Sequence, residues 1–103
     1  MKIKVIEIRA GKPPREKMIG PTKRTFQRHV GGQINVLTVC SDLFVVCNAN
    51  GRGHGLPYNC TIAGIPLYGT VIICGKEGDE FTEAPLSLDM LNTFGLISRG
   101  AEA

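Results

Sequence analysis

The sequence predicts a small α+β domain, with a mostly antiparallel sheet of four or five strands and two short helices on one face of the sheet. Two observations predict this class. Apolar runs of strand length alternate with glycine- and proline-rich turns, and two segments show an N-cap residue before an apolar stripe and a glycine after it. A chain of 103 residues with 43% apolar residues can bury one core but not two. Residues 1–103 are therefore predicted to form a single globular domain.

The N-terminal segment contains one complete strand pattern and one partial pattern. Residues 3–9 are β-rich, and the run ends before Pro13 and Pro14 because proline cannot continue a hydrogen-bonded ladder. The charges that interrupt this run are typical of an outer edge of a sheet. After a connection that is expected to be exposed, residues 16–19 are predicted to form a partial strand.

A short helix is predicted over residues 22–30. Thr22 is the N-cap, Phe26 and Val30 share one face at spacing i, i+4, and Gly31–Gly32 supplies the left-handed stop. This spacing predicts that one helix face packs on the sheet.

Positive charge is concentrated before residue 30, where nine of the twelve lysines and arginines lie. Three of these bases, Lys23, Arg24 and Arg28, lie off the apolar stripe, so the helix shows the solvent a basic side. This side could bind nucleic acid through counterion release, and the alternative is that the charges only keep the segment soluble. His29, in the last turn, is expected to interact with the helix dipole, with acid–base chemistry as the alternative.

The middle of the chain predicts a β-hairpin and a further strand. Residues 33–39 and 43–47 carry apolar strand patterns on either side of Ser41–Asp42. Residues 71–74 form a central strand that ends at Gly75, before an acidic turn.

A second helix is predicted after the acidic turn. Ser87 is its N-cap, Gly95 ends it, and Arg99 to Ala103 are expected to fray. The residues expected in the core are Ile6, Ile8, Phe26, Val30, Ile34, Val36, Leu43, Val45, Ile62, Val71, Ile73, Leu88, Leu91 and Phe94.

The four cysteines and the N-terminus predict a cytoplasmic protein with reduced thiols. The first residues lack the apolar core of an export signal, and no apolar run approaches the roughly 20 residues of a membrane span, so no membrane partner is expected. Three cysteines end apolar runs and are expected to behave as small hydrophobic residues. No Cys-x-x-Cys pair is present, so neither a metal site nor a cofactor is predicted.

The best candidate for binding chemistry is the segment of residues 50–55, called the glycine loop below. Its glycines are expected to leave backbone amides bare, Arg52 offers a planar fork for phosphate or carboxylate, and Asn50 and His54 supply further polar groups. The spacing fits neither a dinucleotide fingerprint nor a Walker loop. Tyr58 and Asn59 could line the same pocket, and the alternative is that Tyr58 covers the sheet edge while Asn59 caps a turn.

No catalytic residue is predicted. The acidic residues of the last third lie in a turn or at a helix start and are expected to be solvated. Cysteine catalysis by Cys60 with His54 or His29 is conceivable, yet no local feature is expected to lower the pKa of this thiol.

Four short motifs carry a resemblance to a known group of proteins. Val-Gly-Gly-x-Ile occurs at residues 30–34, Asn-x-x-Gly at 48–51, Leu-Pro-x-Asn at 56–59 and Gly-Thr-Val at 69–71. In this order they resemble a family of small bacterial and phage or mobile-element proteins whose domain has no assigned function. The resemblance covers residues 22–94, implies an accessory or host-interacting factor, and implies no catalytic residue.

Three hypotheses for function follow. The first is a non-enzymatic binding protein with an unknown protein partner, in which a homodimer is permitted. The second is capture of a nucleotide or another anionic small molecule at the glycine loop. The third is nucleic-acid binding by the basic side of the first helix.

Overall fold

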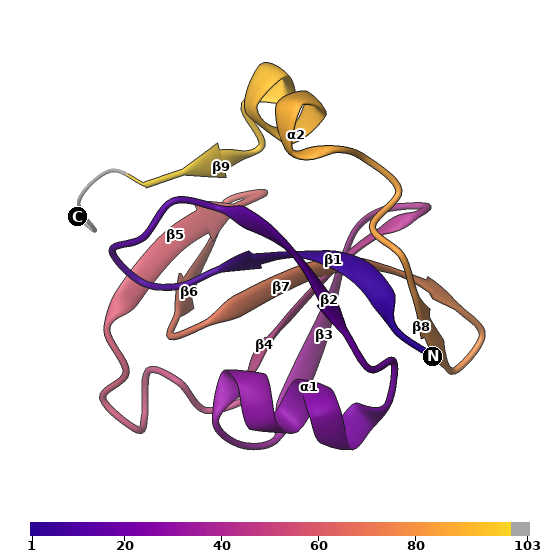
Figure 1. Cartoon of the computed structure of the whole chain (residues 1–103). Coiled ribbons are helices and arrows are strands. Elements are labelled where there is room, and N and C mark those ends of the chain that lie inside the picture. The colour runs from indigo at the N-terminus through magenta and orange to yellow at the C-terminus, as the bar shows by residue number, and fades with distance from the viewer. Residues whose placement is uncertain (100–103) are drawn as a thin grey trace.

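The computed structural model describes residues 1–99, and within them the α+β class is confirmed, with two helices and nine strands in two antiparallel sheets (Figure 1). The large sheet has the strand order β2-β1-β7-β4-β3, and β8 pairs with the C-terminal part of β7. Its strands are β1 (Ile3–Ile8), β2 (Arg15–Ile19), β3 (Ile34–Cys40), β4 (Leu43–Asn48), β7 (Val71–Glu77) and β8 (Glu80–Thr82).

The sheets contain more strands than the four or five predicted. A second sheet of order β6-β5-β9 consists of β5 (Tyr58–Ile62), β6 (Ile65–Tyr68) and β9 (Ile97–Ser98). The β5–β6 hairpin turns at Ala63–Gly64, which have φ angles of 51° and 79°. Alanine rarely adopts a positive φ, so this dipeptide is a weak turn signal in the sequence.

The helices begin and end where their caps predict. Helix α1 (Lys23–Val30) is capped by the Thr22 side chain and ends at Gly31, whose φ of 82° is left-handed. Helix α2 (Leu88–Phe94) is capped by Ser87 and ends at Gly95. Neither α1 nor α2 has the length and apolar character of a membrane span, within residues 1–99.

The prediction that both helices lie on one face of the sheet is wrong. Figure 1 shows α1 and α2 on opposite sides of the large sheet. The reason lies in β7, where Val71 and Ile73 pack in the core cluster that contains α2, while Ile72 and Cys74 pack in the cluster that contains α1. An unbroken apolar strand of this kind is buried on both faces, so each face needs its own cover.

The first strand is not at an edge of the sheet, contrary to its charge pattern. Strand β1 lies between β7 and β2, and β2 is the edge strand on that side. The expected partial strand is therefore a complete one that takes the edge position. At the opposite edge lies β3, joined to β4 by the predicted hairpin.

The core is close to the predicted one. Ten of the fourteen expected residues are buried, and Ile34, Val36 and Leu88 are half-buried. The prediction that Phe94 is buried is wrong, because its side chain at the end of α2 is 59% exposed.

The C-terminal end of the described chain is held by hydrogen bonds rather than frayed at Arg99. The Arg99 guanidinium donates to the backbone oxygens of Lys12 and Arg9 and to Asn59 Oδ1. The prediction of fraying is thus wrong for Arg99, and residues 100–103 lie outside the described part of the chain.

Candidate functional site

The glycine loop closes on itself through its backbone. Asn50 N donates to Asn48 Oδ1 at 2.8 Å, His54 N donates to Asn50 O at 2.9 Å, and Gly55 N donates to Arg52 O at 3.1 Å. The prediction that the loop leaves its amides bare is wrong for these three groups. Amides already bonded inside a turn cannot form an anion-binding nest.

The side chains of the loop contact one another and β6. Asn50 Nδ2 lies 3.2 Å from His54 Nε2, so these two predicted ligands are paired with each other. The Arg52 guanidinium lies 5.6 Å from the centre of the Tyr68 ring, and Tyr58 meets the same ring edge-on at 5.8 Å between centroids. The structure therefore links Arg52 and Tyr58 through Tyr68, while Asn50 and His54 form a separate pair. Asn50, Arg52 and Tyr68 line an open depression of about 350 Å³.

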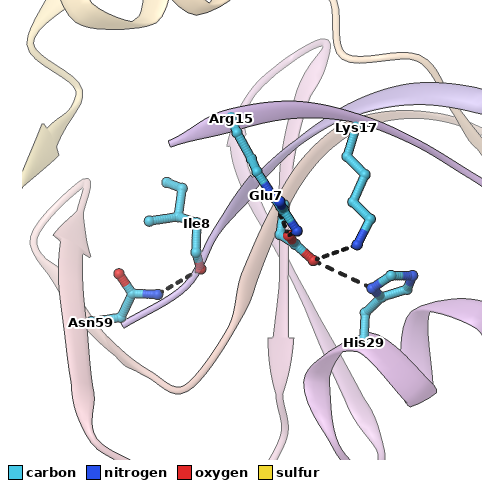
Figure 2. Close-up of polar contacts among 6 residues, drawn as sticks. All are labelled: Glu7, Ile8, Arg15, Lys17, His29 and Asn59. Carbon is cyan, nitrogen blue, oxygen red and sulfur yellow. Dashed lines mark hydrogen bonds and ion pairs between the residues drawn. The ribbon is translucent and has the colours of Figure 1, made fainter. Parts of the chain in front are cut away.

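Asn59 does not join this group. Its side chain is buried, and Nδ2 donates to Ile8 O at 2.8 Å and to Gly69 O at 2.7 Å. Figure 2 shows the first of these bonds, which joins β5 of the small sheet to β1 of the large sheet. Arg99 donates to its Oδ1, so Asn59 holds three segments of backbone together.

A cluster of charged side chains, absent from the sequence-based candidates, lies where β1, β2 and α1 meet. The Glu7 carboxylate is only 4% exposed. Arg15 donates to Oε1 from Nε at 2.9 Å and from Nη2 at 2.8 Å, Lys17 Nζ lies 3.7 Å from Oε2, and His29 Nδ1 lies 3.3 Å from Oε2 (Figure 2). We call these four residues the Glu7 cluster.

The Glu7 cluster favours the charged carboxylate. Burial by itself raises the pKa of Glu7, but the hydrogen bond from Arg15 and the positive charges of Lys17, Arg15 and His29 lower it. The net result is a pKa below the ordinary value of 4.5. Glu7 is therefore ionised at neutral pH and holds β2 and α1 against β1.

The sequence contains a signal for this cluster, but one that needs the strand order. Ile3 and Val5 pack toward α1, and Glu7 is the next residue of that alternating face. A carboxylate at an inward position requires cations close by. Arg15 faces Glu7 and Lys17 faces Val5 in the β1–β2 register, which supplies two of them.

The three bases predicted for nucleic acid separate around α1. Arg24 and Arg28 are exposed and lie four residues apart on one side of the helix. Arg28 lines a depression of about 410 Å³ together with Lys2 and Lys17. Lys23 instead lines a groove with the acidic residues of the β7–β8 hairpin. We call Lys2, Lys17, Arg24 and Arg28 the basic face.

The three buried thiols are unsuited to nucleophilic chemistry at neutral pH. Burial raises the pKa of Cys60 to about 11 and that of Cys74 to about 12, and it also raises the pKa of Cys47. The two histidines contact Glu7 and Asn50, as described above. Among residues 1–99, no group of three His, Cys, Asp or Glu side chains is placed to hold a metal ion.

Comparison with known proteins identifies one family. The family model described as "Domain of unknown function (DUF3846)" matches residues 1–94, which adds β1 and β2 to the segment covered by the motif resemblance. No curated protein and no solved structure matches the chain.

Proposed function

This chain belongs to the DUF3846 family, and we propose that it works by binding, with the basic face taking a polyanion such as the backbone of a nucleic acid. The observation that carries the proposal is the joint placement of Lys2 before β1, Lys17 of β2 and Arg28 of α1 around one depression. Phosphate groups spaced along a backbone suit bases that are spread over a surface in this way.

The electrostatics of the surrounding residues support the proposal. Within residues 1–99, Lys2, Arg24 and Arg28 have no carboxylate at ion-pair distance, so their charges are available to a ligand. The Glu7 carboxylate beside Lys17 is buried and already engaged by Arg15, Lys17 and His29. The carboxylate of β2, Glu16, pairs with Ile6 and therefore points to the opposite face of the sheet.

The glycine loop is a weaker candidate for an anionic ligand. Four of its backbone amides donate to groups within residues 48–55, and the side chains of Asn50 and His54 are paired with each other. Only the Arg52 guanidinium then offers a strong donor group, beside Tyr68. The basic face offers four cationic side chains.

We also propose a cytoplasmic setting and an accessory role in a phage or mobile element. The setting is supported by the four cysteines, all of which are free thiols, as expected in a reducing compartment. The role is supported by the order of motifs noted in the sequence. A factor of this kind could act on host nucleic acid or on a host protein.

Fluorescence anisotropy with labelled single- and double-stranded oligonucleotides tests the proposal, at salt concentrations from about 50 to 200 mM. The Arg24→Gln/Arg28→Gln variant is expected to bind more weakly. The slope of log affinity against log salt is expected to fall by about 2, one for each lost phosphate contact.

The matched control is Arg52→Gln/Lys76→Gln. It also removes two positive charges, but from positions outside the basic face. This control is expected to keep the slope of the unmodified protein. Equal weakening by both double variants would contradict the assignment to this face, and the absence of salt-dependent binding by the unmodified protein would end the proposal.

A further inference from the structure

Strand β3 leaves one side of the large sheet open. It ends the strand order β2-β1-β7-β4-β3, so within residues 1–99 no strand pairs with its outer side. No charged residue occurs from Gly31 to Ser41, and proline is absent from the same segment. Proteins usually protect an exposed edge with charge or proline, because unpaired strand groups invite another strand.

The register of β3 identifies the backbone groups that face outward. Gln33 O accepts from Ala49 N at 2.8 Å, and Ile34 lies opposite Asn48 in the β3–β4 ladder. Hydrogen-bonded and non-hydrogen-bonded pairs alternate along an antiparallel ladder. The N–H and C=O groups that point away from β4 therefore belong to Ile34, Val36 and Thr38.

We propose that this edge is occupied by a second copy of the chain, with two β3 strands pairing antiparallel about a twofold axis at Val36. Val36 then faces Val36 of the partner copy, and Ile34 faces the partner's Thr38. All the outward backbone groups find partners in this arrangement. The facing side chains on this side are β-branched, a favourable cross-strand combination.

Charge and burial favour a second copy as the occupant. Antiparallel pairing of β3 with β3 of a second copy brings no like charges together. The same pairing of two β2 strands would place Arg15, Glu16 and Lys17 in the interface. The apolar side chains of β3 are half-buried on both faces: Ile34 and Val36 beside the α1 cluster, and Leu37 and Val39 beside the α2 cluster. A neighbouring strand would cover the part that is still exposed.

Sedimentation velocity over a concentration series tests this inference. The unmodified protein is expected to shift from monomer to dimer as its concentration rises. Thr38→Lys adds a charge at an exposed position of the edge and is expected to raise the dimer dissociation constant by at least about tenfold. Met18→Lys adds the same charge on the opposite edge, at a side chain that is 49% exposed, and is expected to dimerise like the unmodified protein.

Cross-linking tests the twofold axis. In a Cys40→Ser background, which removes the exposed thiol, Val36→Cys is expected to form a disulfide-linked dimer under mild oxidation. Asn35→Cys, displaced from the axis, is expected not to. A protein that stays monomeric at all concentrations, or a Met18→Lys variant as impaired as Thr38→Lys, would overturn the inference. Cross-linking through Asn35→Cys instead of Val36→Cys would contradict the placement of the twofold axis at Val36.

Discussion

The two edges of the large sheet, β2 and β3, are built from opposite kinds of residue. The sequence of β2 is Arg-Glu-Lys-Met-Ile, and that of β3 is Ile-Asn-Val-Leu-Thr-Val-Cys. The bases of β2 surround a buried carboxylate, whereas the side chains of β3 make no ion pair within residues 1–99. Both strands are outermost in the same sheet, so position alone does not explain the difference.

The comparison teaches that charge on an edge strand can serve two purposes at once. Arg15 and Lys17 discourage another strand from pairing with β2, and they also neutralise Glu7. Strand β3 lacks such protection, as expected of an edge that accepts a partner. Lys17 of the basic face lies on β2, whereas the proposed contact with a second copy lies on β3, at the opposite edge of the large sheet.

The largest expected effect comes from removing the carboxylate that organises the β2 edge. Glu7→Gln is expected to lower the free energy of unfolding by about 2 kcal/mol, because the buried acceptor of Arg15 loses its negative charge. Urea denaturation at neutral pH measures this change. An unchanged midpoint would show that the Glu7 cluster does not stabilise the fold.

The pH dependence of stability sharpens the same point. The pKa of Glu7 is lower in the folded protein than its ordinary value of 4.5. The ionised carboxylate therefore makes its full contribution to the free energy of unfolding above that pH. The contribution is lost as the pH falls through the lower, folded pKa. Thermal unfolding from neutral to acidic pH should therefore show a smaller acid-induced loss in Glu7→Gln than in the unmodified protein, and parallel profiles would contradict the pKa shift.

A smaller effect is expected from the bases of β2, and it should differ between them. Arg15 bonds Oε1 through two nitrogens, so Arg15→Met is expected to cost about 1 kcal/mol even with the guanidinium half exposed. Lys17 lies 3.7 Å from Oε2, and Lys17→Met is expected to cost less than about 0.5 kcal/mol. Chemical denaturation of both variants measures the two losses in free energy of unfolding. A larger loss for Lys17→Met than for Arg15→Met would contradict this expectation.

The smallest effect is expected from adding a lysine to either edge. Thr38 and Met18 are both exposed, so each substitution should change the free energy of unfolding of the dilute monomer by less than about 0.5 kcal/mol. Denaturation at low protein concentration measures this change. A large loss in Thr38→Lys alone would mean that its effect on dimerisation reflects unfolding.

Local features of the fold could be predicted well from the sequence. Thr22 and Ser87 cap the two helices, Gly31 and Gly95 end them, and the β3–β4 hairpin turns at Ser41–Asp42. Each of these depends on neighbours within a few residues. The missed β5–β6 hairpin shows the limit, because Ala63 adopts a conformation that its residue type does not predict.

The candidate sites were less predictable. The glycine loop was found from residue types, yet its amides and its Asn50–His54 pair turn inward, which no pattern of glycines reveals. The charges of residues 3–9 predict an edge strand, and that prediction gives no reason to expect Glu7 to be buried in a cluster. Its burial follows only once β2 covers that side of β1.

By itself, the sequence determined the α+β class, the helix caps and the uncharged stretch that becomes β3, since these follow from residue types and short spacings. Only the tertiary structure decided which strands became edges, which face each helix covers, and that Asn59 bonds Ile8 while Glu7 meets His29. These features join residues far apart in the chain. They therefore depend on which strands lie side by side in the sheet, and no local pattern of side chains specifies that arrangement.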